Sequence, residues 1–152
     1  MSTAPKTAMP TFKVLEFPAL EPEATWHHAN VMLSLYTDPS DLHDDMEAGC
    51  DALVVVDARS REAYESGHIP GAINFPHREI DAKSVRHRLP KDKLIITYCD
   101  GLGCNASTKG ALKLAFHGFR VKELLGGINW WVRDGYSLVR GRDPGPGAQC
   151  GC

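Results

Sequence analysis

Two short runs of apolar residues constrain the fold of this chain more than any other feature. The runs, residues 53–56 and 94–98, are continuous, rich in β-branched side chains and free of the polar alternation of a half-exposed strand. A strand of this kind is buried on both faces, which is typical of a parallel sheet covered by helices. The sequence therefore predicts an α/β fold.

Helix signals precede and follow the first of these strands. Asp38 is followed by a proline and an acidic first turn, which predicts a capped helix that ends near Gly49. Ser60 similarly starts a short helix that runs to Ser66. Helices that alternate with apolar strands are the pattern expected of an α/β domain.

The second strand is followed by another helix and strand. Asn105 or Ser107 can cap a helix that ends at Gly118. A strand over residues 120–124 then leads through two glycines into a last helix. The residues expected to form the apolar face of the first of these helices are Ala111, Leu112, Ala115 and Phe116.

The two ends of the chain differ in composition from its middle. Residues 1–11 are rich in Ser, Thr, Ala and Pro, and residues 143–152 are rich in Gly and Pro. We therefore expect flexible segments at both ends. The 152-residue length fits one domain, and we expect residues 12–142 to form it.

Charge, hydropathy and cysteine content exclude several classes of protein. A net charge of -2 argues against a nucleic-acid partner, which normally requires a basic surface. We expect no membrane span, because no run approaches roughly 18 apolar residues, and residues 1–10 lack an apolar signal-peptide core. Five cysteines, an odd number, favour reduced thiols over a disulfide framework. A cytoplasmic location is the prediction.

Cys99 is the strongest candidate for chemistry. It follows the strand at 94–98, at the edge where open α/β sheets bind ligands. The next residues, 100–105, contain two glycines and precede a helix, so their amides and the helix dipole are expected to favour a thiolate at Cys99. The alternative is a small buried hydrophobe at a strand end.

Several motifs, in order along the chain, resemble those of the rhodanese-like domain family. The resemblance covers roughly residues 38–138. Singly each motif is weak, whereas the ordered set predicts the fold. The motifs are VVVDAR at 54–59, SGHIPGAIN at 66–74, YC at 98–99, GF at 118–119 and LGGI at 125–128 followed by Trp130 or Trp131.

The resemblance implies a fold and an activity. The fold is a parallel five-stranded sheet flanked by helices on both faces, and the activity is sulfur transfer. Cys99 would take sulfane sulfur from a donor such as thiosulfate, hold it as a persulfide and pass it to a thiol acceptor. No metal or organic cofactor is implied. The residues expected to bind the substrate are Asp100, Gly101, Leu102, Gly103, Cys104 and Asn105.

The loop after Cys99 departs from the family pattern. It is about two residues longer than usual, and Asn105 stands where related phosphatases and arsenate reductases carry an arginine. Anion binding would then fall to backbone amides and to Lys109. A thiol-dependent phosphatase or arsenate reductase, and a non-catalytic binding module, are the alternatives to a sulfurtransferase.

The other cysteines have competing interpretations. Cys104 is either a resolving thiol that forms a disulfide with Cys99 or an inert residue of the first helical turn. Cys150 and Cys152 lie in the flexible C-terminal segment, where a sulfur-accepting or metal-binding role competes with simple disorder. Cys50 is expected to pack, and no zinc site is predicted.

Other polar and aromatic residues have weaker functional signals. Asp57 and Arg59 either shape the pocket or form a structural ion pair. His68 is expected to bond backbone in a turn rather than to act as a base. His77 and Arg78 could line the pocket mouth, and we expect Trp130 and Trp131 to pack. Residues without an assigned role are Trp26, His27 and His28.

Overall fold

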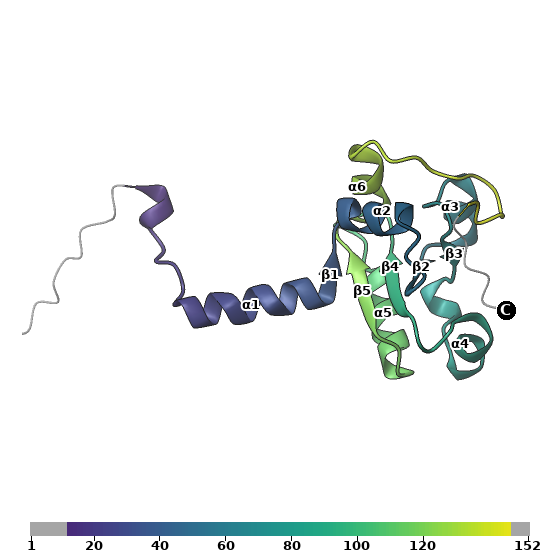
Figure 1. Ribbon diagram of the computed structural model, residues 1–152, viewed down its shortest axis with the longest axis horizontal. Helices are drawn as coiled ribbons and strands as arrows, with labels where there is room; N and C mark the ends of the chain where they lie inside the picture. Colours follow the sequence, from purple (N-terminus) through teal and green to yellow (C-terminus); the bar gives the residue numbers. More distant parts are fainter. Residues whose placement is uncertain (1–11, 147–152) are drawn as a thin grey trace, which may run out of the picture. The chain divides into compact units, whose positions relative to one another are not determined.

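A parallel sheet forms the centre of the computed structural model, which describes residues 12–146. Its strand order is β1-β5-β4-β2-β3, and every pairing is parallel (Figure 1). The predicted α/β class with a five-stranded parallel sheet is confirmed. The strands are β1 (Tyr36–Thr37), β2 (Leu53–Asp57), β3 (Ile73–Asn74), β4 (Leu94–Tyr98) and β5 (Val121–Leu124).

The two apolar runs form adjacent strands in the middle of this sheet. β2 and β4 pair from Leu53 opposite Leu94 to Asp57 opposite Tyr98. In each strand the last four residues are buried, which explains the absence of polar alternation. Because the strands are parallel, the residues that follow them lie at the same edge of the sheet.

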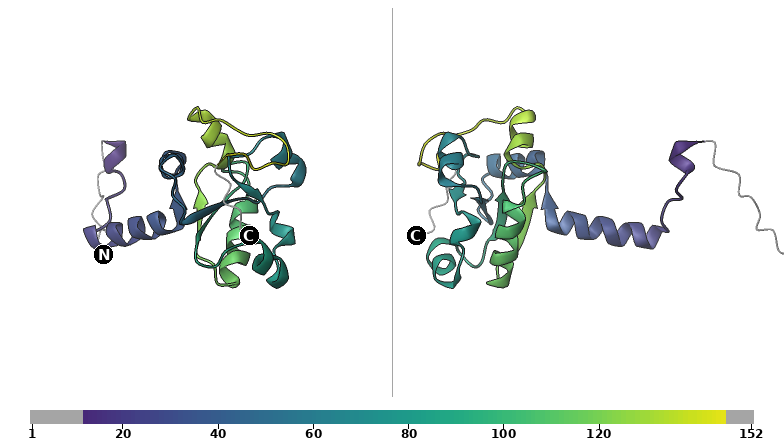
Figure 2. Two further views of the ribbon diagram at one scale, coloured as in Figure 1. Left: turned by 45° about the vertical axis from the view of Figure 1, so that its right-hand side comes forward. Right: turned by 180° about the vertical axis from the view of Figure 1, so that it is seen from behind.

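Helices cover both faces of the sheet (Figures 1 and 2). Val55 packs in a buried cluster with Leu42 and Trp131 from α2 and α6. Val56 packs in a second buried cluster with Leu114 from α5 and Val85 from α4. The helices of the α/β unit are α2 (Pro39–Glu47), α3 (Arg61–Ser66), α4 (Ala82–Arg88), α5 (Ala106–Phe116) and α6 (Gly127–Arg133), with a short 3-10 helix, η2 (His77–Glu79).

Two of the predicted helix starts are confirmed in detail. The Asp38 side chain accepts a hydrogen bond from the Asp41 amide at 2.9 Å, and the Ser60 hydroxyl accepts one from the Ala63 amide at 3.2 Å. Each bond satisfies one of the amides that the first helical turn leaves unpaired. At α5, Asn105 takes the N-cap position but its side chain makes no capping bond.

The predicted apolar face of α5 is wrong. Leu112 and Phe116 are 71% and 85% exposed, whereas Ser107, Gly110 and Leu114 are the buried residues of this helix. A Cβ atom at Gly110 would lie 3.6 Å from the Ala58 Cβ, so the helix lies close to the sheet. A helix this close to the sheet requires small residues on part of its buried face. The positions of the large apolar residues therefore did not indicate which face of α5 is buried.

The N-terminal part of the chain is a separate compact unit. The chain divides into one unit that ends at Met32 and another that starts at Leu33. The first contains a 3-10 helix, η1 (Lys13–Leu15), and most of α1 (Pro22–Leu35), neither of which has a buried residue. The predicted start of a single domain at residue 12 is therefore too early, since these residues contribute to no core. None of the helices described is long and apolar enough to cross a membrane.

The C-terminal boundary also differs from the prediction. The backbones of His68 and Val139 exchange two hydrogen bonds of 2.9 Å, and the Gly71 amide donates to Pro144 O at 2.7 Å. Residues 143–146 were expected to be flexible, but Asp143 and Pro144 are thus hydrogen-bonded to residues near the sheet. Cys150 and Cys152 lie outside the described residues.

Candidate active site

Cys99 lies directly after β4, at the edge of the sheet where β2 also ends. Its side chain is 2% exposed. The thiol donates to Cys104 O at 3.3 Å, and its Sγ lies 3.3 Å from the Ser107 Oγ. The buried sulfur therefore has polar neighbours from the following loop and from the first turn of α5.

The loop that carries this sulfur is fixed by the start of α6. The Ile128 amide donates to Cys99 O and the Asn129 amide to Asp100 O, both at 3.0 Å. Gly127 has a φ of +56°, and a Cβ atom there would lie 2.3 Å from Cys99 O. Only glycine permits this approach. A Cβ at Gly101 would similarly come within 2.8 Å of the Asn129 Nδ2.

Backbone amides influence the acidity of the two thiols. The amides of Ala106 and Asp100 lower the pKa of Cys104, and the Ser107 amide works to lower that of Cys99 against the larger effect of burial. The Cys104 amide donates a hydrogen bond to Gly101 O at 3.0 Å. In the predicted binding segment, residues 100–105, Asp100 and Cys104 thus lie close to the Cys99 sulfur, whereas Gly101 takes part in the packing of the loop itself. Its solvent-exposed residues are Asp100, Leu102, Gly103 and Asn105.

The electrostatics of the two thiols differ from the prediction of a thiolate at Cys99. Burial raises the pKa of Cys99, and a hydrogen bond with Cys104 raises it further, against the opposing effect of Ser107. Partial burial also works to raise the pKa of Cys104, but hydrogen bonds from Cys99 and from two backbone amides lower it overall. Cys104 is therefore the more acidic member of the pair, since it is less buried and receives more hydrogen bonds.

A carboxylate behind the site was missed by sequence reasoning. Glu123 on β5 accepts hydrogen bonds from the Ser107 hydroxyl at 2.9 Å and from the Thr108 hydroxyl at 2.8 Å. The single Ser107 proton can go to Glu123 or to a thiolate at Cys99, so the carboxylate competes with the sulfur for it. The only sequence signal for this contact was the presence of an acidic residue, Glu123, near the carboxyl end of the strand predicted at 120–124.

The comparison with known proteins covers the segment that forms this site. The family model of the rhodanese-like domain matches residues 38–134. The chain belongs to the rhodanese-like domain family. The predicted resemblance is thereby confirmed.

Two solved structures resemble this chain. A crystal structure of the BH2092 protein from Bacillus halodurans is similar to this rhodanese-like domain, with a TM-score of 0.76 and 43% identity over 80% of this chain and 88% of that one. The thiosulfate sulfurtransferase from Pseudomonas aeruginosa shares the fold, with a TM-score of 0.62 and 24% identity over 78% of this chain and 21% of that one.

One of the curated relatives is longer than this chain. The HTH-type transcriptional regulator Rv0324 of Mycobacterium tuberculosis is 35% identical over 101 residues, which are 66% of this chain and 43% of the regulator. The chain therefore spans less than half the length of that relative.

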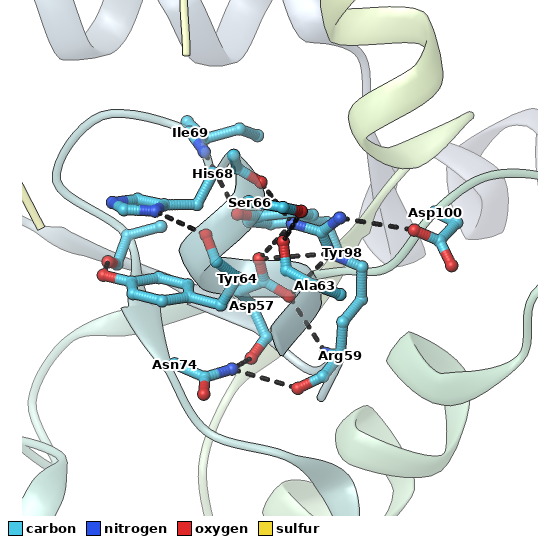
Figure 3. A network of polar contacts seen from close by, with 12 residues as sticks. Asp57, Arg59, Ala63, Tyr64, Ser66, His68, Ile69, Asn74, Tyr98 and Asp100 are labelled. Atoms are coloured by element: carbon cyan, nitrogen blue, oxygen red, sulfur yellow. Dashed lines mark hydrogen bonds and ion pairs between the residues drawn. The ribbon is translucent and has the colours of Figure 1, made fainter. Parts of the chain in front are cut away.

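Asp57 and Arg59 form a buried structural pair beside the site of this rhodanese-like domain (Figure 3). The Arg59 guanidinium lies 2.7 Å from the Asp57 Oδ2, and it donates to Gly67 O at 2.7 Å. Its remaining nitrogen reaches the Asp100 Oδ1 at 3.3 Å. These bonds favour the structural interpretation of the pair, because they leave the guanidinium engaged within the protein rather than directed at a ligand.

His68 is fully buried and bonds backbone, as predicted for a turn residue. Its Nδ1 lies 2.9 Å from Tyr64 O and its Nε2 lies 3.1 Å from Asp143 O. The ring also stacks on the Tyr64 ring, with centroids 3.7 Å apart. With both nitrogens engaged by carbonyl oxygens, His68 connects α3 to the C-terminal segment.

Basic side chains gather between η2 and α5. Lys113 donates to His77 O at 2.6 Å. Burial lowers the pKa of His77, and the positive charges of Lys113, Lys109 and Arg78 lower it further. His77 and Arg78, predicted at the pocket mouth, thus belong to a basic group with two lysines of α5.

Trp131 and Cys50 line a cavity to which Cys99 does not contribute. Trp131 is 1% exposed and donates to Ser137 O at 2.9 Å, which fits a packing role, whereas Trp130 is 41% exposed. Cys50 lines a cavity of about 620 Å³ with His43, and Cys99 does not line it. In residues 12–146 no cluster of metal-ligating side chains was found. The residues to which the sequence assigned no role, Trp26, His27 and His28, lie on α1.

Proposed function

We propose that this rhodanese-like domain is a sulfurtransferase that carries sulfane sulfur as a persulfide on Cys99. The observation that supports the proposal is the position of Cys99 at the carboxyl end of β4, buried and with its sulfur in hydrogen-bonding distance of the Ser107 hydroxyl. Donors held in place before the reaction stabilise charge on sulfur without further reorganisation.

The first half-reaction is nucleophilic. The Cys99 thiolate attacks the outer sulfur of a donor such as thiosulfate, the S–S bond of the donor breaks, and sulfite leaves with the electron pair. The new S–S bond leaves a persulfide on Cys99. A thiol acceptor then removes the outer sulfur and regenerates the thiolate.

Phosphoryl transfer is less well supported than sulfur transfer. Asn105, in the position where related phosphatases use arginine, is exposed and lacks a guanidinium. The nearby Arg59 is engaged by Asp57 and by Gly67 O. A phosphoryl transition state would therefore lack the bidentate cation that stabilises its charge.

Sulfite release tests the proposal. Incubation of the protein with thiosulfate, without added thiol, is expected to release one equivalent of sulfite per chain, since sulfite leaves whatever becomes of the bound sulfur later. A Cys50→Ser variant is the matched control and should release the same amount, because Cys50 does not contact the reacting sulfur. Absence of sulfite from the native protein, and of any sulfur adduct with other sulfane sulfur donors, would overturn the proposal.

The basic group is expected to help bind the anionic donor. Lys109 is exposed one turn into α5, the helix whose first amides surround the sulfurs. Lys109→Ala should raise the KM for thiosulfate about two- to fivefold with little change in kcat, since an exposed charge contributes little more than about 1 kcal/mol.

Salt provides the control for this electrostatic effect. The difference between Lys109→Ala and the native protein should shrink as ionic strength rises. Lys91→Ala, an exposed substitution in the turn before β4, should leave the KM unchanged. Equal effects of the two substitutions would contradict a specific role for Lys109.

A further inference from the structure

A second thiol adjoins the reacting sulfur. Cys104 is partly exposed, whereas Cys99 is 2% exposed. The Cys99 Sγ lies 3.3 Å from Cys104 O, so the backbone that carries the second thiol is in contact with the reacting sulfur. Cys104 therefore lies on the solvent side of the buried sulfur and within reach of it.

The surroundings of Cys104 favour a nucleophile. Partial burial works to raise the pKa of its thiol, but the Cys99 side chain and the amides of Ala106 and Asp100 lower it overall. A thiolate at Cys104 is consequently more available than one at Cys99. A disulfide requires the two Cβ atoms to lie about 4 Å apart. The space next to Gly103, the residue before Cys104, is open, since a Cβ there would meet nothing within 4 Å.

Resting on the proposed function, we propose that Cys104 is a resolving thiol for the Cys99 persulfide and that this protein releases the outer sulfur as hydrosulfide. The Cys104 thiolate attacks the Cys99 Sγ, and a disulfide bond forms between the two residues. The S–S bond of the persulfide breaks, and the outer sulfur leaves with the electron pair and its own proton as HS⁻. Cys104 is oxidised and the outer sulfur is reduced to sulfide, so the step needs no other oxidant.

Turnover then requires a reductant of a definite chemical class. An external dithiol restores both thiols by thiol–disulfide exchange, attacking first at the more accessible Cys104 sulfur. The complete cycle consumes one sulfane sulfur and one dithiol, and it yields sulfite, hydrosulfide and one external disulfide when thiosulfate is the donor. When Cys104 resolves the persulfide, a dithiol reductant therefore takes the place of the external thiol acceptor as second substrate.

The test compares the native protein with Cys104→Ser after treatment with thiosulfate in the absence of added thiol. The native protein should release one equivalent each of sulfite and hydrosulfide, and its mass should fall by two hydrogens. Peptide mapping should then find Cys99 linked to Cys104. Cys104→Ser should also reach one equivalent of sulfite in total, at a rate that differs from the native rate, but should release no hydrosulfide, and its mass should rise by one sulfur. Cys50→Ser is the control and should behave like the native protein.

Each outcome has a distinct meaning. Sulfite without hydrosulfide from the native protein, or equal hydrosulfide from both proteins, overturns the inference alone. Absence of sulfite from both overturns the proposed function together with the inference. Cys104→Ala provides a second variant if Cys104→Ser does not fold, and thermal unfolding of each variant verifies that the domain is intact.

Discussion

Cys99→Ser is expected to slow sulfite release from thiosulfate by at least about a thousandfold, the scale of loss seen when a covalent nucleophile is removed. A serine hydroxyl is far less acidic than a thiol and attacks sulfur poorly. The fold should remain intact, because a serine hydroxyl can donate to Cys104 O in place of the thiol, at a position 2% exposed. Single-turnover sulfite measurements, paired with thermal unfolding, test both statements.

The pH profile of the native protein strengthens this test. Because burial raises the pKa of Cys99, the thiolate is a minor species at neutral pH, and its fraction grows as pH rises toward the raised value. The rate of the first sulfite release should therefore increase with pH through the neutral range. A rate that is independent of pH there, or a Cys99→Ser variant with undiminished activity, would contradict the assignment of Cys99 as the nucleophile.

Arg59→Met is expected to destabilise the domain by about 3–5 kcal/mol, the usual cost of leaving a buried charge without its partner. Asp57 is 0% exposed and its carboxylate lies 2.7 Å from the Arg59 guanidinium. The variant also loses the bonds from Arg59 to Gly67 O and to the Asp100 carboxylate. The measurement is the free energy of unfolding in urea.

A neighbouring arginine and a double variant give the controls. Arg61 is exposed at the start of α3, so Arg61→Met should change the free energy of unfolding by less than about 0.5 kcal/mol. Asp57→Asn combined with Arg59→Met should cost less than the sum of the two single changes, because the unpaired charge is gone. A loss below about 1 kcal/mol for Arg59→Met would mean that the pair contributes no more than an exposed salt bridge.

Local signals predicted the central part of the fold. The runs at 53–56 and 94–98 identified the buried parallel strands, and capping side chains at Asp38 and Ser60 identified two helix starts. β1 and β3 carry no comparable signal, since each has two residues and only partly buried side chains. Their positions depend on pairing with β5 and β2, which is a property of the assembled sheet.

The candidate site was predicted in location but not in its interactions. Parallel strand order placed Cys99 and the following loop at the correct edge of the sheet. The contact between Ser107 and Glu123 depends on the register of β5, in which Glu123 pairs with Thr97, and no local pattern encodes it. The relative acidity of Cys99 and Cys104 depends likewise on burial and on amides that converge only in the folded loop.

The contact between α6 and the Cys99 loop has a consequence for when the protein becomes reactive during its synthesis. β4 and Cys99 leave the ribosome before Ile128 and Asn129, whose amides hold the carbonyls of residues 99 and 100. Domains fold as units while the chain emerges from its N-terminus. The ordered sulfur site is therefore completed only when the segment from Gly127 onward has been made, so a partly synthesised chain holds its thiol without the geometry that makes it useful.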